Sequence, residues 1–428
     1  MNNEFTWRIS RFLYFTRRVK GSIALRGWRG AFKRLFQQRK GFRPSGGLEV
    51  AQDFPTRPAG LPVRRMLVVD SMVPDPNRDS GSMRLSQMLG LLHRDGWQID
   101  FFAADGFATS KDVARLATMG VHYRSGSPFR WLRRQGAALD AALLCRLPVA
   151  SQYIDIIRRH APNATVVFDT VDLHYVREQR AAALTGSQRL YRHAAQSRRH
   201  ELTAIQRSDV TLVVSEEERR TLARELPRTR VELLSNIHEI HGRQRDFESR
   251  SDLLFVGGFG HPPNADAMQW FAAEILPLLH ASEPGLVLHL VGDIDDAAQK
   301  ALKRNGLVIH GRVDDIRPLM DSCRVSVAPL RFGAGVKGKV NLAMSYGLPV
   351  VVTSIAAEGM YLGDESNALI ADDAVSFAAA VLRLYRDRDL WLRLSDGALE
   401  NVRHHFSLEQ AKLSLHRVFP PPTSRDET

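Results

Sequence analysis

The chain has 428 residues, of which 44% are hydrophobic and 25% charged, with 59 Lys and Arg against 47 Asp and Glu. These proportions are those of a globular protein, so they exclude disordered and fibrous folds. The length predicts two domains or slightly more. The two cysteines are too few for a disulfide framework or a metal cluster and favour a reducing, cytoplasmic compartment.

The net charge of +12 is concentrated at the N-terminus. Residues 1–44 contain twelve basic residues and one acid, whereas the rest of the chain carries 47 basic and 46 acidic residues. Leu25, Trp28, Phe32 and Leu35 share one face of an expected helix that basic residues flank. This pattern is typical of attachment to an anionic membrane surface. Packing onto the protein itself or a partner is the alternative; nucleic acid is disfavoured because no known nucleic-acid module accompanies the charge.

Apolar and helical patterns divide the chain into six segments. No apolar run is long enough for a membrane-spanning helix. The expected segments are a basic amphipathic helical extension at 1–44, a Pro- and Gly-rich linker at 45–65, a first α/β domain at 66–245, a second at 246–406, a helix at 407–419 that can cross back to the first domain, and a disordered tail at 420–428.

Short apolar runs alternate with helical patterns from Met66 onward, which predicts βαβ units and mostly parallel sheets. Ligands of such doubly wound domains bind at the carboxyl ends of the strands. Helices are expected at Met83–Arg94, from about Arg177 to Arg207, and after Ser407. The expected strands are Met66–Asp70, Gln98–Phe102, Ala141–Leu144, Thr165–Asp169, Val210–Val214, Asp252–Val256, Leu286–Val291, Leu307–His310, Val325–Pro329, Pro349–Thr353 and Ala368–Ile370.

A glycine-rich loop, FVGGFGHPPN at 255–264, leads from a strand into a helix. Gly257, Gly258 and Gly260 let a ligand approach the backbone, and Asn264 is a good N-cap residue. The start of a helix favours a bound phosphate. The loop lacks the spacing G-x-G-x-x-G, which argues against a dehydrogenase.

A second glycine loop follows the strand at 325–329 and contains Gly333 and Gly335. A helix is expected to begin near Val336, which places Lys337 and Lys339 in its first turn. The helix dipole disfavours cations there unless an anion is present, so the pattern indicates a diphosphate site. Two solvated lysines are the alternative.

Together these motifs resemble those of group 1 glycosyltransferases, the large retaining family numbered four, which have the GT-B architecture. The resemblance covers residues 66–418 and implies an α/β fold of two Rossmann-like doubly wound domains facing a cleft, with the acceptor on the first domain and the nucleotide sugar on the second. The motifs, in the expected order, are VVDSMVPDPNRDSGSMR at 68–84, FDTVDLHYVREQR at 168–180, DVTLVVSEEER at 209–219, VGGFGHPPNADAMQWFAAEILPLL, LVGD at 290–293, GRVDDIRPLM at 311–320, FGAGVKGKVNLAMSYGLPVVVTS and AAEGM at 356–360.

The resemblance implies that the two glycine loops hold the donor diphosphate and that the segment at 311–313 holds the base. Lys337 and Lys339 supply charge in place of a metal, so neither a metal nor another cofactor is expected, and the nucleotide sugar is a substrate. The implied donor-binding residues are Gly257, Gly258, Phe259, Gly260, His261, Asn264, Gly311, Arg312, Arg331, Gly333, Gly335, Lys337, Lys339, Asn341 and Glu358.

The first domain carries the implied catalytic and acceptor-side residues. Asp172 and His174 follow a strand, where a histidine can bind a donor-sugar hydroxyl or position an acceptor; a capping Asp and a structural His are the alternative. Ser80, Gly81 and Ser82 fit the loop that closes over the donor–acceptor junction in related enzymes, and Arg84 could meet an anionic acceptor. Plain N-capping of the first helix is the alternative for this loop.

One departure from the family pattern bears on function. Two glutamates that the family usually carries are replaced here by Ala334 and Leu342, and Asn341 or Glu358 could substitute for them. We expect a retaining, metal-independent transferase of bacterial polysaccharide biosynthesis, moving a sugar to a surface glycan or lipid-linked acceptor. It would be peripheral on the inner face of the cell membrane and bind no nucleic acid. The missing glutamates favour the alternative of a non-catalytic GT-B scaffold that binds glycan or a partner transferase, and a GT-B sugar-nucleotide epimerase is a further alternative.

Overall fold

The computed structural model describes residues 64–421 except 77, 78, 303 and 334. The amphipathic extension predicted at 1–44, nearly all of the predicted linker and the tail from residue 422 lie outside the described residues, as does Ala334. Within the described part of the chain, no helix is long and apolar enough to cross a membrane.

The N-terminal half forms a seven-stranded parallel sheet in the order β3-β2-β1-β4-β5-β6-β7. Its strands are β1 (Arg64–Asp70), β2 (Trp97–Ala103), β3 (Val121–Tyr123), β4 (Ala141–Cys145), β5 (Thr165–Asp169), β6 (Val210–Val213) and β7 (Val231–Leu233). The helices are α2 (Ser80–Arg94), α3 (Ser110–Thr118), α4 (Pro128–Gln135), α5 (Leu147–His160), α6 (His174–Thr185), α7 (Gln188–Arg207) and α8 (Glu216–Glu225).

The C-terminal half forms a six-stranded parallel sheet in the order β10-β9-β8-β11-β12-β13. Its strands are β8 (Ser251–Val256), β9 (Leu288–Val291), β10 (Leu307–Gly311), β11 (Cys323–Ala328), β12 (Val350–Val352) and β13 (Leu369–Ile370). The helices are α9 (Pro262–Trp270), continued by a π-turn (Phe271–Ile275) into α10 (Leu276–Ser282), then α11 (Asp296–Leu302), α12 (Arg317–Ser322), α13 (Gly338–Ser345), α14 (Ser354–Ala357), α15 (Ala374–Arg386), α16 (Arg388–Phe406) and α17 (Leu408–Val418).

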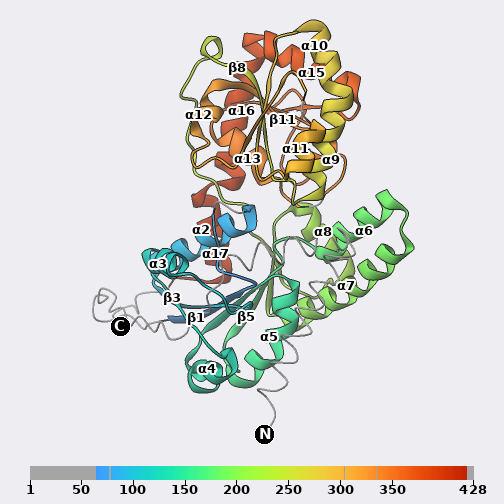
Figure 1. The fold of residues 1–428 in the computed structure, drawn as a ribbon. Helices are drawn as coiled ribbons and strands as arrows, with labels where there is room; N and C mark the ends of the chain where they lie inside the picture. The colour runs from blue at the N-terminus through green and yellow to red at the C-terminus, as the bar shows by residue number, and fades with distance from the viewer. Residues whose placement is uncertain (1–63, 77–78, 303, 334, 422–428) are drawn as a thin grey trace.

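The two sheets confirm the predicted α/β class, with two doubly wound domains (Figure 1). Parallel strands are covered by helices on both faces, so their sequences are continuous apolar runs, and the segment Met66–Val69 is 0% exposed throughout. Each predicted strand is present with slightly shifted ends. Sequence reasoning missed β3 and β7, the three-residue strands at the edges of the first sheet.

The long helix predicted from about Arg177 to Arg207 is two helices. Gly186 lies between them with a left-handed φ of 63°, which a glycine adopts without steric cost, and Ser187 then caps α7 through Leu190 N. In Figure 1, α6 and α7 extend together from the side of the first domain. The prediction failed because a single glycine within a polar helical pattern does not by itself end a helix.

The final helix of the chain packs on the first domain. Ser407 caps α17, and Leu415 and Phe419 belong to the same apolar cluster as β1 and α2. The ring of Phe419 meets Trp97 edge-on, with 5.8 Å between centroids. In Figure 1, α17 accordingly lies beside α2, far from the sheet that precedes it in sequence.

This packing predicts a position-specific loss of stability. Leu415 is fully buried, so Leu415→Ala should lower the free energy of unfolding by about 2–5 kcal/mol. Leu413 on the same helix is 59% exposed, and Leu413→Ala should change it by less than about 0.5 kcal/mol. Urea denaturation followed by tryptophan fluorescence measures both variants. Equal losses would contradict the packing of α17 described here.

Candidate functional site

The two domains meet through loops at the carboxyl ends of their central strands. The loop between β11 and α13 contacts the loop between β5 and α6. Gly335 of the first loop lies so close to Asp172 of the second that a Cβ placed on Gly335 would be 3.5 Å from the Cβ of Asp172. A Cβ on Gly338 would lie 2.8 Å from the Cβ of Ser80, so a larger residue would force the domains apart. The structure thus brings the predicted acceptor-side and donor-side loops together.

An ion pair links the domains beside these loops. Both oxygens of Glu358 accept hydrogen bonds from Arg180 of α6, at 2.5 and 2.6 Å, and Arg180 also donates to the Gly333 carbonyl. Burial alone would raise the pKa of Glu358, but Arg180 outweighs it and lowers the pKa. Both carboxylate oxygens of Glu358, which was predicted to bind the donor, are therefore bound to Arg180. The sequence did not point to this arginine.

Lys339 is directed into the first glycine loop. Its ammonium group donates a hydrogen bond to Asn264 Oδ1 and lies 4.5 Å from the ring centre of Phe255. The Asn264 amide in turn donates to the Gly258 carbonyl at 2.9 Å. A Cβ on Gly257 would lie 2.7 Å from Asn264 Nδ2, so only glycine leaves room for this contact.

The first glycine loop differs from its prediction in one respect. Asn264 is not the N-cap of α9; His261 occupies that position, and Asn264 lies within the helix. Pro262 and Pro263 come first in the helix and have no N–H group, so this helix end offers fewer donors to a phosphate than predicted. The positive charge at this loop comes instead from Lys339, which α13 supplies.

Lys337 occupies the N-cap position of α13 at the second glycine loop, without a capping side-chain hydrogen bond, and is 7% exposed. Its ammonium group donates to the Gly335 carbonyl at 2.7 Å. Burial lowers the pKa of Lys337 to about 8 and that of Lys339 to about 7, the latter with a contribution from Lys337. Both lysines therefore gain charge when an anion binds beside them, as the sequence pattern predicts for a diphosphate.

Three other predicted donor residues, Arg331, Arg312 and Asn341, differ in their partners and exposure. Arg331 is bound by Asp266 at 2.5 and 2.9 Å, and Arg312 lies 4.0 Å from Asp75 of the first domain. Asn341 is fully buried, and neither end of its amide has a partner among the described residues. It therefore lacks the exposed position that a substitute for the missing glutamate would need.

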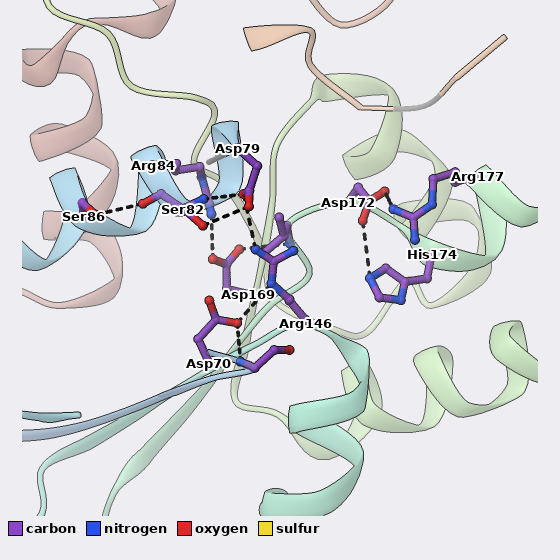
Figure 2. A network of polar contacts seen from close by, with 12 residues as sticks. Asp70, Asp79, Ser82, Arg84, Ser86, Arg146, Asp169, Asp172, His174 and Arg177 are labelled. Atoms are coloured by element: carbon purple, nitrogen blue, oxygen red, sulfur yellow. Dashed lines mark hydrogen bonds and ion pairs between the residues drawn. The ribbon is translucent and has the colours of Figure 1, made fainter. Parts of the chain in front are cut away.

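His174 begins α6, next to the contact with the second domain. Its Nε2 atom lies 3.4 Å from Asp172 Oδ1, and Arg177 pairs with the other oxygen of Asp172, as Figure 2 shows. Burial, reinforced by Arg177, lowers the pKa of His174 to about 4. The imidazole is therefore uncharged at neutral pH. In this form it can hydrogen-bond a hydroxyl but does not serve as a general acid.

Two buried glutamates that sequence reasoning missed hold the loop before His174. Glu201 of α7 accepts from the backbone N–H groups of His174 and Tyr175, at 3.2 and 3.1 Å. Glu218 of α8 accepts from Leu173 N and Val214 N, at 3.0 and 3.1 Å. These contacts serve as caps for α6, which has no side-chain cap of its own. The cue in the sequence was Ser215-x-x-Glu218, an N-cap pattern after a strand.

Arg84 does not face the acceptor side, which corrects the sequence prediction. It is 1% exposed and pairs with Asp169 at 2.6 Å, as Figure 2 shows. It also donates to the carbonyls of Leu234 and Ser235. Ser82 is likewise buried, and its N–H and hydroxyl groups bond to the N-cap residue Asp79. For these two residues the structural alternative holds.

Gly81 allows a close approach between the start of α2 and a neighbouring charged group. A Cβ on Gly81 would lie 2.9 Å from Val171 and 3.1 Å from the guanidinium of Arg146. Arg146 lies between Asp70 and Asp79, at 3.0 and 3.7 Å (Figure 2). Arg146 therefore joins the ends of β1 and β4 to the start of α2 beneath the interdomain contact.

A groove of about 400 Å³ opens beside the Arg180–Glu358 pair. Its lining includes Glu217 and Arg220 from α8 together with Glu358 and Tyr361 from the second domain. Among the described residues, no group of three or more His, Cys, Asp or Glu side chains could hold a metal ion.

The second domain is similar to a known family. Residues 250–387 match the model of the family described as "Glycosyl transferases group 1". This range includes both glycine loops and the two lysines. The match and the fold support a glycosyltransferase, the class of enzyme predicted from the motifs.

A protein of the cps region of Klebsiella pneumoniae, described as uncharacterized, is 25% identical over 177 residues. The alignment covers 39% of this chain and 44% of that protein, so the chain spans less than half the length of this relative. The similarity is too partial to transfer an activity.

Solved structures share the fold at low sequence identity. HepE of Anabaena, in complex with UDP and glucose, has a TM-score of 0.61 and 13% identity over 82% of this chain and 98% of that one. Sucrose-phosphate synthase of Thermosynechococcus elongatus has a TM-score of 0.63 and 16% identity over 83% and 98%. At these identities the similarity establishes the two-domain fold alone.

The buried glutamates predict a pH dependence of stability. Burial raises the pKa of Glu201 to about 8, above its value of 4.5 in an unfolded chain. Between these values the folded state holds a proton that the unfolded state has lost, so this group lowers stability as pH rises. Glu201→Gln should remove up to about 1.4 kcal/mol per pH unit of this slope.

Urea denaturation at about pH 5.5 and 7.5 measures the slope for the wild type and the variant. The exposed Glu409 on α17 supplies the control, since Glu409→Gln should leave the slope unchanged. The slope is unaffected by any constant loss of stability in the variant. Identical slopes for Glu201→Gln and the wild type would contradict the raised pKa.

Proposed function

We propose that the protein is a glycosyltransferase that moves a sugar from a nucleotide-sugar donor to a surface glycan or lipid-linked acceptor. The observation that carries the proposal is the pair of lysines, Lys337 buried and Lys339 half-buried, at two glycine loops within the region that matches group 1 glycosyltransferases. A nucleoside diphosphate supplies negative charge to these lysines, which form no ion pair within the described residues. UDP, which HepE binds in its solved complex, is the first nucleotide to test.

The proposed reaction retains the anomeric configuration and uses no metal. Lys337 and Lys339 stabilise the negative charge that develops on the departing diphosphate. The leaving diphosphate oxygen takes the acceptor proton, so the protein needs no separate general base. His174 is neutral, lies beside Asp172, and has its backbone N–H bound by Glu201. We propose that its imidazole hydrogen-bonds a donor-sugar hydroxyl and orients the reactants.

The proposed location is the inner face of the cell membrane. The basic residues of 1–44 support peripheral attachment to anionic lipid, and lipid-linked acceptors reside at such a surface. The partial similarity to a protein of a cps region supports a role in polysaccharide synthesis.

A nucleotide-binding measurement tests the donor site. UDP and UDP-sugars should raise the thermal unfolding temperature, because a ligand that binds only the folded state stabilises it. Lys339→Met should weaken UDP binding at least about tenfold through loss of a charge-assisted hydrogen bond. Lys300→Met, at an exposed position of α11, is the matched control and should bind as the wild type does.

Failure of the folded wild type to bind any nucleoside diphosphate or its sugar, across a broad panel, would reject the donor site. Binding without transfer to any acceptor would favour the non-catalytic scaffold that the missing glutamates suggest. Release of an epimerised sugar without an acceptor would favour the epimerase.

The lysine pKa values predict that diphosphate affinity falls as pH rises. A bound diphosphate favours charged lysine, so the pKa of Lys339 rises from about 7 on binding. Above pH 7 binding therefore takes up a proton, and the Kd should increase by up to about tenfold per pH unit. Calorimetry at about pH 8 in two buffers of different ionisation enthalpy counts the protons. If UDP binding to the wild type takes up no proton, or if proton uptake is the same in Lys339→Met, the lowered pKa of Lys339 is contradicted.

A further inference from the structure

The groove beside the Arg180–Glu358 pair has the size of a small-molecule site. Its volume of about 400 Å³ falls within the usual range of about 300–1,000 Å³ for such sites. One wall is α8 of the first domain, which lies at the junction of the two domains (Figure 1), and the other is the segment 354–370 of the second domain. We call it the α8 groove and define it by Glu216, Glu217, Arg220, Ala357, Glu358 and Tyr361.

The two walls of the α8 groove are fixed against each other. Gly359 has a left-handed φ of 73°, and a Cβ there would lie 2.8 Å from the Cβ of Ser215, the N-cap residue of α8. Beside this contact, Arg180 of the first domain binds both carboxylate oxygens of Glu358. Contacts between the domains thus set the width of the groove.

Tyr361 gives the groove an exposed aromatic surface. It is 39% exposed, although its ring stacks on His405 with 3.9 Å between centroids. Its backbone is left-handed, with a φ of 55°, which is an outlier for a bulky residue, and such outliers cluster at ligand-binding sites. Burial, together with Glu216 and Glu217, raises the pKa of its phenol. The phenol therefore keeps its proton and can donate a hydrogen bond.

A carboxylate oxygen of the α8 wall lacks a hydrogen-bond donor. Oε2 of Glu217 is buried, and no group in the described part of the chain donates to it. It lies close to the facing wall, because a Cβ on Gly359 would be 3.2 Å away. A buried acceptor without a partner costs free energy, and a hydroxyl group can donate to a carboxylate without adding charge.

The charges around the groove are largely paired. Glu216 binds Arg219 and Arg220, at 2.8 and 3.7 Å, and Glu358 binds Arg180. These arginines are therefore already matched with glutamates, which leaves little attraction for a lipid phosphate or an acidic sugar. An uncharged ligand rich in hydroxyl groups fits this lining better.

The groove adjoins the proposed donor site. Arg180, which binds Glu358 in the groove, also donates to the Gly333 carbonyl of the second glycine loop, at 2.9 Å. The backbone N–H group of Lys337 contacts Met360 Sδ, at 3.1 Å, in the wall of the second domain. A ligand in the α8 groove is thus close to the loop that is proposed to hold the diphosphate.

We propose that the α8 groove binds an uncharged sugar of the acceptor glycan. This inference rests on the proposed function and names the part of the acceptor that the protein recognises. The Tyr361 ring contacts the C–H groups of the sugar, and its hydroxyl and the Glu217 carboxylate bind sugar hydroxyls. Because α8 belongs to the first domain, the groove suits the acceptor rather than the sugar of the donor.

Ligand-detected NMR titrations of the full chain, with and without saturating UDP, test the proposal. The probes are the uncharged methyl glycosides of glucose, galactose, mannose and N-acetylglucosamine, with methyl glucuronide as the acidic counterpart. At least one uncharged glycoside should bind the wild type. Methyl glucuronide should bind at least about fivefold more weakly, because glutamates line the groove.

Two variants of the groove and a matched control locate the binding. Tyr361→Ala should weaken binding of the glycoside at least about fivefold through loss of the ring contact. Glu217→Gln keeps the shape of the side chain and should weaken it at least about threefold, since the hydrogen bond loses its charge. Tyr191→Ala removes a tyrosine of similar exposure, 41%, from α7 and should stay within about twofold of the wild type.

The outcomes separate this inference from the proposed function. The groove assignment is overturned if no uncharged glycoside binds the wild type, if methyl glucuronide binds best, or if either groove variant binds as the control does. It is also overturned if Tyr361→Ala weakens binding of UDP-glucose but not of the glycoside, because the groove then holds the donor sugar. UDP binding, measured by thermal shift, should be unchanged in all three variants, and its absence from the wild type would reject the donor site instead.

Discussion

Lys337 is buried and Lys339 is half-buried, and neither forms an ion pair within the described residues. Lys339 has an amide and an aromatic ring as neighbours, and Lys337 has a backbone carbonyl. Burial disfavours their charged forms, as the lowered pKa values reflect. The two lysines therefore form a positively charged site that an anionic ligand such as the proposed diphosphate would stabilise. The glycine loops, including the close contact at Gly257, serve to keep this space open.

The first domain has the opposite character. Its charged groups at the carboxyl edge of the sheet are already satisfied: Arg84 by Asp169 and two carbonyls, and the loop before His174 by Glu201 and Glu218. Completed networks fix geometry, whereas incomplete ones favour binding. One domain thus supplies a rigid surface against which reactants can be oriented, and the other supplies most of the affinity for an anion. The Arg180–Glu358 pair holds the two surfaces together.

The sequence was sufficient to predict what depends on neighbouring residues. Buried parallel strands give apolar runs, so most strands could be located, while the three-residue edge strands β3 and β7 have no such run. The glycine loops and their lysines could also be located, because their pattern lies within a few residues. Arg84 and Arg180 could not be assigned, since their partners lie 150 and 178 residues away. The N-cap assignment of Asn264 overlooked the two prolines that begin α9.

Charge shows the same contrast between local and distant information. Counting along the sequence assigns nearly all of the net charge to residues 1–44 and leaves the rest of the chain almost neutral. The fold, however, pairs acids with arginines across long separations, as Arg158 with Asp209 and Arg417 with Glu232. Pairing is uneven, because other exposed arginines, such as Arg133 at the end of α4, form no ion pair among the described residues. A net charge near zero therefore constrains the sum of the charges on a domain but not where an anionic partner meets it.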